Sequence, residues 1–455
     1  MIVPTHRLLI FYGLIMPFLT VLPVLRGEAA IPAFAAGLIL ILVAVLDAAF
    51  GSFRLRNIRV DLPTMVRMTR DRESSIELSV TNSDMRAKTL RLGLPLPREI
   101  SSPQEDLLTF LPKNAEHLSV LWLCTPLRRG QFHIHGCYVE TESFFGLWAF
   151  RGFRDGACEI RVYPNLAREK NNLAALFLTR GGYGIHVRRQ HGKGREFEKL
   201  REYIPGDGFD EIHWKATAKR RHPITKVFQI ERTQEVYVAI DTSRLSARST
   251  GAKEDFGGGD PSDLNASDSC LERFIAAALV VGLAAQKQGD LFGLLTFSDS
   301  VHEFLRARGG KSHYGACREQ LFHLHPRMVN PDYEELSTFI RLKLRRRALI
   351  IVLTSLDDPI LSESLTRTVD LMGRHHLVMV NMLRPAGALP VFSNENIASP
   401  EEIYHELSGH TLWHHLREIE STLARHGVHF ALLDRERLCV DLVSQYMNVK
   451  QRQLL

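Results

Sequence analysis

The chain has 455 residues, of which 45% are hydrophobic and 24% are charged, and this composition is typical of folded proteins. Lys and Arg total 57 against 51 Asp and Glu, an excess too small to indicate a nucleic-acid-binding protein. The cysteines are scattered and form no C-x-x-C pair, so free thiols in a reducing compartment are expected rather than a disulfide framework.

Two apolar runs, residues 8–25 and 30–50, stand near the N-terminus and are separated only by RGEA. A membrane-spanning helix needs about 20 such residues, so the runs predict a hairpin of two spans. Basic residues flank its outer ends: Arg7 before the first run, and Arg54, Arg56 and Arg59 after the second. The positive-inside rule then places both termini in the cytoplasm. The alternative is a cleaved signal peptide ending near GEAA, which the second apolar run disfavours.

The next region, residues 51–185, is predicted to form β structure. It contains short, partly alternating runs rich in Val, Ile, Leu and Phe, separated by Pro, Gly, Asn and Asp. These runs lie at 74–82, 88–96, 117–124, 131–140 and 158–164. Strands in succession without a helical period predict a small antiparallel β-sandwich.

From residue 235 onward, strands alternate with helices. Strands are predicted at 236–240, 291–297, 348–354, 377–383 and 428–433. Helices are predicted at 270–288 after a Ser269 cap, at 312–324, 332–343 and 361–373, from Pro400 to Gly427, and at the C-terminus. Strands that are apolar throughout and alternate with helices predict a doubly wound α/β domain over 235–455.

The stretch D-T-S-R-L at 241–245 resembles the D-x-S-x-S motif of von Willebrand factor type A domains. The resemblance implies a Mg²⁺ site built from oxygen ligands on three loops. Asp241 and Ser243 match, but Leu245 replaces the second serine, Lys311 stands where the threonine is expected, and Ser355 replaces the second aspartate. We therefore expect a degenerate site without metal, whose Asp241 is neutralised by a lysine or arginine. The alternative is a divalent-metal-dependent ligand-binding module, with Mg²⁺ as its cofactor.

The segment GKGREFEKLREYIPGDGFDEIHWKATAK, residues 192–219, carries a second resemblance. It is similar to the signature of the bacterial domain-of-unknown-function family numbered 58. Asp210 departs from that signature, standing where the family usually has arginine. The matching residues are Gly192, Gly194, Glu196, Phe197, Leu200, Arg201, Tyr203, Pro205, Gly206, Asp207, Ile212, Trp214 and Ala216. The segments LRRGQF, SFFGLW and VYPN at 127–132, 143–148 and 162–165 also resemble the family.

This second resemblance implies a protein of the bacterial inner (plasma) membrane that works with a MoxR-type AAA+ ATPase and other membrane-associated proteins. The expected organisation is a transmembrane hairpin (1–50), a β-sandwich-like module (51–185), a signature connector (186–234) and a von Willebrand A-like α/β domain (235–455). The expected function is that of a non-enzymatic adaptor or scaffold, with no nucleic-acid partner and no cofactor.

The signature segment itself allows two interpretations. It is either a structural clamp, with Phe197, Leu200, Ile212 and Trp214 anchored on a sheet, or a docking surface for a partner. Pro205-Gly206 is suited to a tight turn. A third hypothesis, an enzyme using Glu196, Asp207 and His213 as acid–base residues, ranks last because the sequence has no phosphate loop and no nucleophile elbow.

Overall fold

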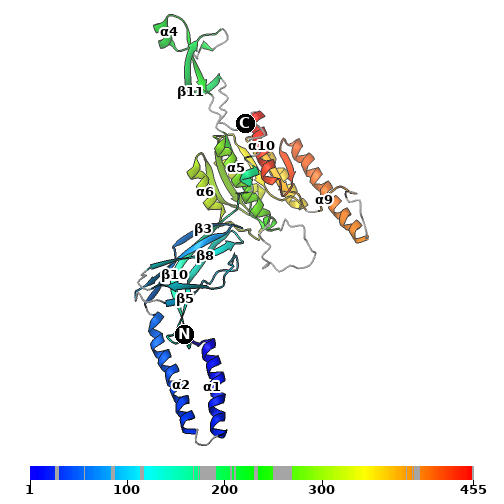
Figure 1. The fold of residues 1–455 in the computed structure, drawn as a ribbon. Coiled ribbons are helices and arrows are strands. Elements are labelled where there is room, and N and C mark those ends of the chain that lie inside the picture. Colours follow the sequence, from blue (N-terminus) through cyan, green and yellow to red (C-terminus); the bar gives the residue numbers. More distant parts are fainter. Residues whose placement is uncertain are drawn as a thin grey trace. The chain divides into compact units, whose positions relative to one another are not determined.

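The computed structural model divides into two compact units, Met1–Asn165 and Leu166–Leu455, each of which is described by itself. It describes residues 1–25, 30–55, 57–83, 88–112, 117–167, 169–172, 174, 191–204, 208–209, 212–229, 234–248, 269–385, 387–391, 393 and 400–452. Figure 1 shows the elements in chain order.

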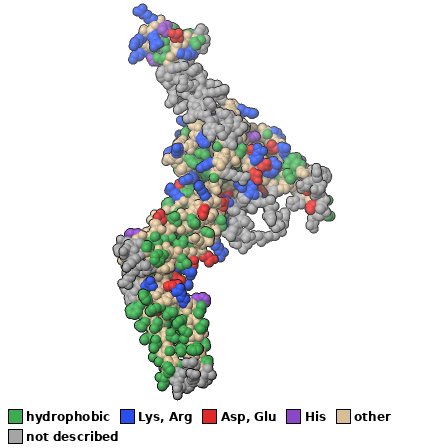
Figure 2. Space-filling model, in the orientation of Figure 1, with side chains coloured by type: hydrophobic (Ala, Val, Ile, Leu, Met, Phe, Trp, Pro, Cys, Tyr) green, Lys and Arg blue, Asp and Glu red, His purple; other side chains and the backbone are tan. Residues whose placement is uncertain are grey.

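The first unit begins with two helices, α1 (His6–Leu25) and α2 (Ala30–Gly51), which lie side by side in Figure 1. The Tyr12 hydroxyl donates a hydrogen bond to the Leu40 carbonyl over 3.2 Å. Figure 2 shows hydrophobic side chains over the surface of both helices. Among the described residues, the stretch Ile31–Gly51 is long and apolar enough to cross a membrane, whereas the apolar part of α1, His6–Val21, is shorter.

The rest of the first unit is a β-sandwich around one hydrophobic core. One sheet has the order β1 (Ile2–Pro4), β10 (Trp148–Tyr163), β9 (Gly130–Glu142), β5 (Lys88–Gly93) and β7 (Leu107–Leu111), with β3 (Met65–Thr69) also paired to β10. The other has the order β2 (Ile58–Asp61), β4 (Ser74–Asn82), β8 (His117–Pro126) and β6 (Ile100–Ser101). Alternate side chains of both sheets, such as Leu78 and Ile160, are buried in that core.

The sandwich departs from the expected antiparallel pattern at one pair of strands. β3 runs parallel to β10, with Met65 opposite Glu159. β10 is much longer than expected. Its pairing with β1 ends at Phe150, and the strand continues to Tyr163, so that its later residues can pair with β3. The sequence indicated only the second half of β10, since its first half is interrupted by Gly and Asp residues that are typical of turns.

The loop between β9 and β10, SFFGLW, is held by both apolar helices. The buried carboxylate of Asp47 on α2 accepts hydrogen bonds from the Ser143 hydroxyl (2.5 Å) and the Phe145 amide (3.0 Å). At the start of α1, the Thr5 hydroxyl donates to the Gly146 carbonyl over 2.6 Å. The helices and the sandwich are therefore joined by specific polar contacts within one unit.

The second unit is built on a sheet of six strands. Their order is β15 (Val301–Arg308), β14 (Leu291–Phe297), β13 (Glu235–Asp241), β16 (Leu349–Leu353), β17 (Leu377–Leu383) and β18 (His429–Leu433). All pairs are parallel except β14 with β15. This is the doubly wound order 3-2-1-4-5-6 with an antiparallel edge strand, so the predicted α/β class is confirmed.

Helices cover both faces of this sheet. The core on one face includes residues of α5 (Cys270–Lys287), α6 (Lys311–Leu321) and α10 (Leu438–Arg452), and the other includes residues of α7 (Tyr333–Lys343), α8 (Pro359–Gly373) and α9 (Pro400–Arg425). The sequence did not indicate β15, because an edge strand buries little of its length and VHEFLRAR carries charges along it.

The signature segment forms a separate two-stranded sheet, β11 (His191–Glu202) with β12 (Ile224–Gln229), and a short helix, α4 (Trp214–Arg220), before β12. None of these elements was predicted from the sequence, because the segment is rich in charged residues and shows neither a helical nor a strand period.

Candidate functional site

Asp241 lies at the carboxyl end of β13, the edge where parallel sheets commonly bind ligands. Its side chain is fully buried. One carboxylate oxygen accepts a hydrogen bond from the Ser243 amide over 2.7 Å, and the other accepts one from the Thr354 hydroxyl over 2.6 Å. Burial raises the pKa of Asp241, and the hydrogen bonds oppose that rise.

Thr354 connects Asp241 to a second buried group. Its oxygen lies 2.9 Å from the hydroxyl of Tyr333, the first residue of α7, which is also fully buried. Because the single Thr354 proton is directed to Asp241, the Tyr333 hydroxyl donates to Thr354. The result is a buried chain of hydrogen bonds, Tyr333 to Thr354 to Asp241, which we call the rim chain.

The rim chain was not predicted from the sequence, although Thr354 carries a detectable signal. Successive side chains of a strand point to opposite faces, so Thr354 follows Ile350 and Val352 on the face that contains Ala239. Counting by two along both strands places Asp241 and Thr354 on the same face of the sheet. Tyr333 gave no such signal, since a helix start does not reveal which strand end it approaches.

The expected neutralisation of Asp241 by a lysine or arginine is wrong. Among the residues that the structure describes, the side-chain partners of the Asp241 carboxylate are hydroxyl groups, and no lysine or arginine forms an ion pair with it. The nearby arginines pair with other carboxylates: Arg248 with Asp357, and Arg244 with Asp358 over 3.6 Å.

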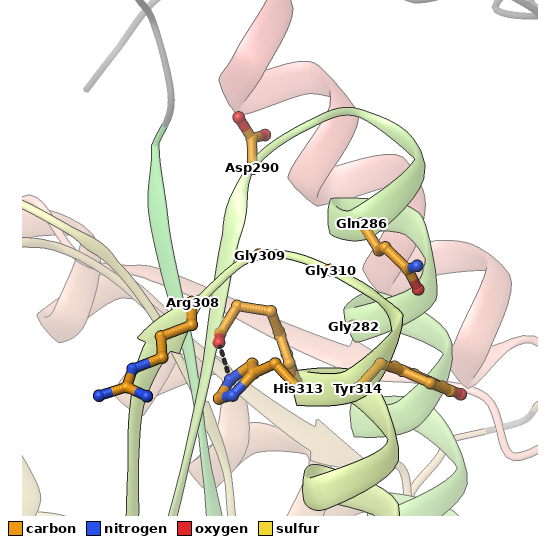
Figure 3. Close-up of a pocket in the computed structure, with 9 residues that line it drawn as sticks. Gly282, Gln286, Asp290, Arg308, Gly309, Gly310, His313 and Tyr314 are labelled. Atoms are coloured by element: carbon orange, nitrogen blue, oxygen red, sulfur yellow. Dashed lines mark hydrogen bonds between the residues drawn. The ribbon is translucent and has the colours of Figure 1, made fainter.

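Lys311 cannot approach Asp241, because it lies at the opposite edge of the sheet. β15 is antiparallel to β14 and brings Arg308 opposite Phe292 at the amino end of β14. Figure 3 shows Gly309 and Gly310 in the turn that leads into α6, near His313, which hydrogen-bonds the Phe292 carbonyl over 2.8 Å. Gly309, Gly310 and His313 line a small pocket together with Asp290. Asp290 pairs with Lys450 over 2.7 Å.

A different loop stands beside Asp241. The amide of Arg327 donates to the Thr242 carbonyl over 2.7 Å, and the amide of Arg244 donates to the Val329 carbonyl over 3.0 Å. The Arg244 side chain also reaches Asn330 over 2.5 Å. Loop 325–332 therefore lies where the von Willebrand A resemblance placed the loop around Lys311.

The remaining candidate ligands are Ser243 and Ser355. The Ser243 hydroxyl accepts from the Leu245 amide over 3.3 Å, where it caps the short 3-10 helix Arg244–Ala247. Ser355 is buried. Within the described part of the chain, no group of three or more His, Cys, Asp or Glu residues is placed to hold a metal ion.

The signature segment exposes several apolar side chains, and two of them, Leu200 and Trp214, are residues that the clamp interpretation would anchor on a sheet. Trp214 is 67% exposed and Phe209 is 76% exposed, and Leu200 and Ile204 are also exposed. The expected anchoring on a sheet is therefore wrong for Leu200 and Trp214, whereas Ile212 is buried and bridges to Thr225. We call Leu200, Ile204, Phe209 and Trp214 the signature patch.

The same segment also carries exposed basic side chains. Lys215, Lys219 and Arg220 on α4 and the following Arg221 are all exposed, and Figure 2 shows Lys and Arg gathered on this part of the surface. His213 caps α4 by accepting from the Ala216 amide over 3.0 Å, so it has a structural role.

Several other signature residues have no described side-chain position. Gly192, Gly194, Glu196 and Phe197 lie on β11, but the structure describes only their backbone. Pro205, Gly206 and Asp207, with the turn predicted there, lie outside the described residues. Arg201 donates to the Glu202 carbonyl over 3.2 Å, and the Tyr203 amide donates to Pro223 over 3.0 Å.

These elements define a doubly wound α/β domain with a buried aspartate at the carboxyl end of β13, preceded in the chain by the two-stranded signature segment. Comparison with known proteins agrees with the second resemblance. The family model described as "Protein of unknown function DUF58" matches residues 199–402 of this chain.

The relatives found by comparison are distant. The "Uncharacterized protein YeaD" of Bacillus subtilis is 28% identical over 113 residues, which is 25% of this chain and 28% of that protein. Two solved structures, an aerotolerance-related membrane protein from Bacteroides fragilis and the conserved hypothetical protein BatB from Bacteroides thetaiotaomicron, are each 14% identical with a TM-score of 0.30. Each comparison covers 48% of this chain, and 100% and 99% of those chains respectively.

Proposed function

We propose that this chain is a scaffold anchored in the bacterial inner membrane by α1 and α2, with both termini in the cytoplasm. Its α/β domain is of the von Willebrand A type, and it binds a partner protein instead of a metal-linked ligand. The partner that the family resemblance implies is a MoxR-type AAA+ ATPase. The chain would supply position and recognition, and the ATPase would supply the chemistry.

Membrane anchoring is supported by the exposed apolar surface of the helices. Large apolar side chains are exposed on α1 and α2, among them Leu14, Phe18, Phe34 and Leu38. Soluble proteins rarely expose so large an apolar surface to water, and such surfaces mark contacts with a membrane or a partner. The arginines at the outer ends favour a cytoplasmic location for both termini.

The hydrogen bonds of Asp241 support the proposal that the α/β domain binds its partner without a metal. A Mg²⁺ site keeps its carboxylate available to the cation, whereas Asp241 is buried and accepts hydrogen bonds from the Ser243 amide and the Thr354 hydroxyl. The rim chain gives this carboxylate a structural role in joining β13, the end of β16 and α7.

The observation that carries the proposal is the exposure of the signature patch. Trp214 and Phe209 are both exposed on this short segment, and exposed aromatic side chains form binding hot spots because they contribute most to protein interfaces when partners bury them. The exposed basic residues of α4 favour a partner with an acidic surface and would speed their association.

The proposal is tested by purifying the full chain from its native membranes in a mild detergent. We expect a MoxR-type ATPase to be enriched with the wild type, and its recovery to fall by about tenfold or more in the double variant Phe209→Ala/Trp214→Ala, since truncating a hot-spot residue costs about 2 kcal/mol or more. The control is Ile360→Ala, which removes an equally exposed apolar side chain from the start of α8.

Two results would count against this function. One is the recovery of the wild-type chain with no such ATPase enriched. The other is equal recovery of the ATPase with the double variant and with Ile360→Ala, which would place the interface elsewhere.

A further inference from the structure

A groove of about 520 Å³ opens in the first unit between α1, α2 and the SFFGLW loop. This volume lies within the range of small-molecule binding sites. Its walls are mainly apolar, and they are formed by Ile10, Phe11, Leu40, Val43, Phe145 and Leu147.

The walls of the groove are held in place by hydrogen bonds outside it. Asp47 fixes the Phe145 amide over 3.0 Å, and the Thr5 hydroxyl fixes the Leu147 carbonyl over 2.9 Å. Tyr12, which also lines the groove, bonds across from α1 to the Leu40 carbonyl on α2. The groove is therefore formed before any ligand arrives, which lowers the entropic cost of binding.

Arg7 is the single charged residue among those that line this groove. It is exposed and makes no hydrogen bond or ion pair with any residue that the structure describes. A guanidinium group beside an apolar channel matches a ligand with one anionic head and a long apolar tail, because arginine binds phosphate oxygens in a fork and the channel favours hydrocarbon.

We propose that this groove is a specific site for one anionic bilayer phospholipid. An acyl chain lies along the walls of α1 and α2, and the phosphate lies on Arg7. The bound lipid fills the space between the helices and the SFFGLW loop, and so supports the joint between the membrane anchor and the sandwich. This inference rests on the membrane anchoring proposed above.

The test uses the full chain in nanodiscs of phosphatidylcholine that contain a minor fraction of phosphatidylglycerol, followed by native mass spectrometry after mild release. We compare the wild type with Arg7→Gln, with Val43→Trp, which fills the groove, and with Arg59→Gln, which removes an exposed positive charge of β2 outside the groove. A parallel series replaces phosphatidylglycerol with a diacylglycerol of the same chains, which lacks the phosphate.

The wild type and Arg59→Gln are expected to retain one phosphatidylglycerol. Retention by Arg7→Gln should fall by about tenfold or more, to the level of the diacylglycerol, since a hydrogen bond to a charged group contributes about 1.5–3 kcal/mol. Val43→Trp should lose both lipids. Equal retention by Arg7→Gln and Arg59→Gln, or unchanged retention by Val43→Trp, would overturn the site.

Extraction with alkaline carbonate separates this inference from the function on which it rests. A wild-type chain that resists extraction but retains no lipid contradicts the lipid site alone. A chain released by carbonate contradicts the membrane anchor and the lipid site together.

Discussion

The Thr354 hydroxyl donates a hydrogen bond to the Asp241 carboxylate over 2.6 Å, although the two residues are 113 positions apart in the chain. The bond joins the carboxyl ends of β13 and β16, which are paired strands of the parallel sheet. Tyr333 extends it to α7. We expected the Asp241 carboxylate to pair with a lysine or arginine, or in the alternative with a metal. It instead links β13, the end of β16 and α7 through buried hydrogen bonds.

Replacing Thr354 with valine removes the hydroxyl and keeps the shape. The buried Asp241 and Tyr333 would each lose a partner, so we expect local stability to fall by about 1–3 kcal/mol. Hydrogen exchange of the full chain in detergent should show faster exchange in β13 and β16. The matched change Thr422→Val on α9, where the hydroxyl bonds the Glu418 carbonyl at the surface, should leave those strands unchanged.

Divalent cations should not stabilise the protein through Asp241. A ligand that binds only the folded state raises the unfolding temperature, and the stabilisation grows with the logarithm of the ligand concentration above its Kd. We expect the unfolding temperature to be the same in millimolar Mg²⁺, in Mn²⁺ and after chelation, because the Asp241 oxygens already accept hydrogen bonds. Saturable binding of either cation by calorimetry, lost in Asp241→Ala, would favour the metal-dependent alternative.

Buried His376, just before β17, should make the α/β unit sensitive to mild acid. Burial lowers its pKa, and the positive charges of His375 and Arg347 lower it further. A depressed pKa means that the folded state binds this proton less readily than the unfolded state does, so stability is full above about pH 6.5 and is lost as the pH falls below it. His376→Phe should reduce the loss of stability between pH 7 and pH 5, measured by urea unfolding of both proteins. An identical pH profile for the two would contradict this role.

Asp47 should control the order of the SFFGLW loop. In Asp47→Ala, the Ser143 hydroxyl and the Phe145 amide lose their acceptor, and we expect the exchange protection of residues 143–148 to fall by about 1.5–3 kcal/mol. The sandwich strands β4 and β8 should keep their protection, which distinguishes loss of the joint from unfolding of the module. Unchanged exchange of the loop would show that the carboxylate does not hold it.

Much of the fold could be predicted from the sequence because burial patterns are local. The strands at 291–297 and 377–383 were located at the bounds found in the structure, since both are apolar throughout and flanked by clear helices. Likewise, Ser269 caps α5 by accepting from the Glu272 amide, as its spacing from Glu272 predicted.

The candidate site was harder to predict because it depends on which loops meet in space. Lys311 was expected near Asp241 because of its position along the chain. β15 runs antiparallel to β14, however, and so returns the chain to the amino ends of the parallel strands before Lys311. Trp214 was expected to pack on a sheet because large aromatic residues usually do, and only the structure shows it exposed. Exposure of this kind cannot be deduced from residue type.

Site-specific photo-crosslinking tests the central claim most directly. A photoreactive phenylalanine analogue is placed at position 214 in one strain and at position 360 in another, both in the full chain in living cells. We expect a crosslink from position 214 to a MoxR-type ATPase and none from position 360. The proposed function is contradicted if position 214 crosslinks to no protein while the chain is inserted in the membrane, or if both positions crosslink to that ATPase equally.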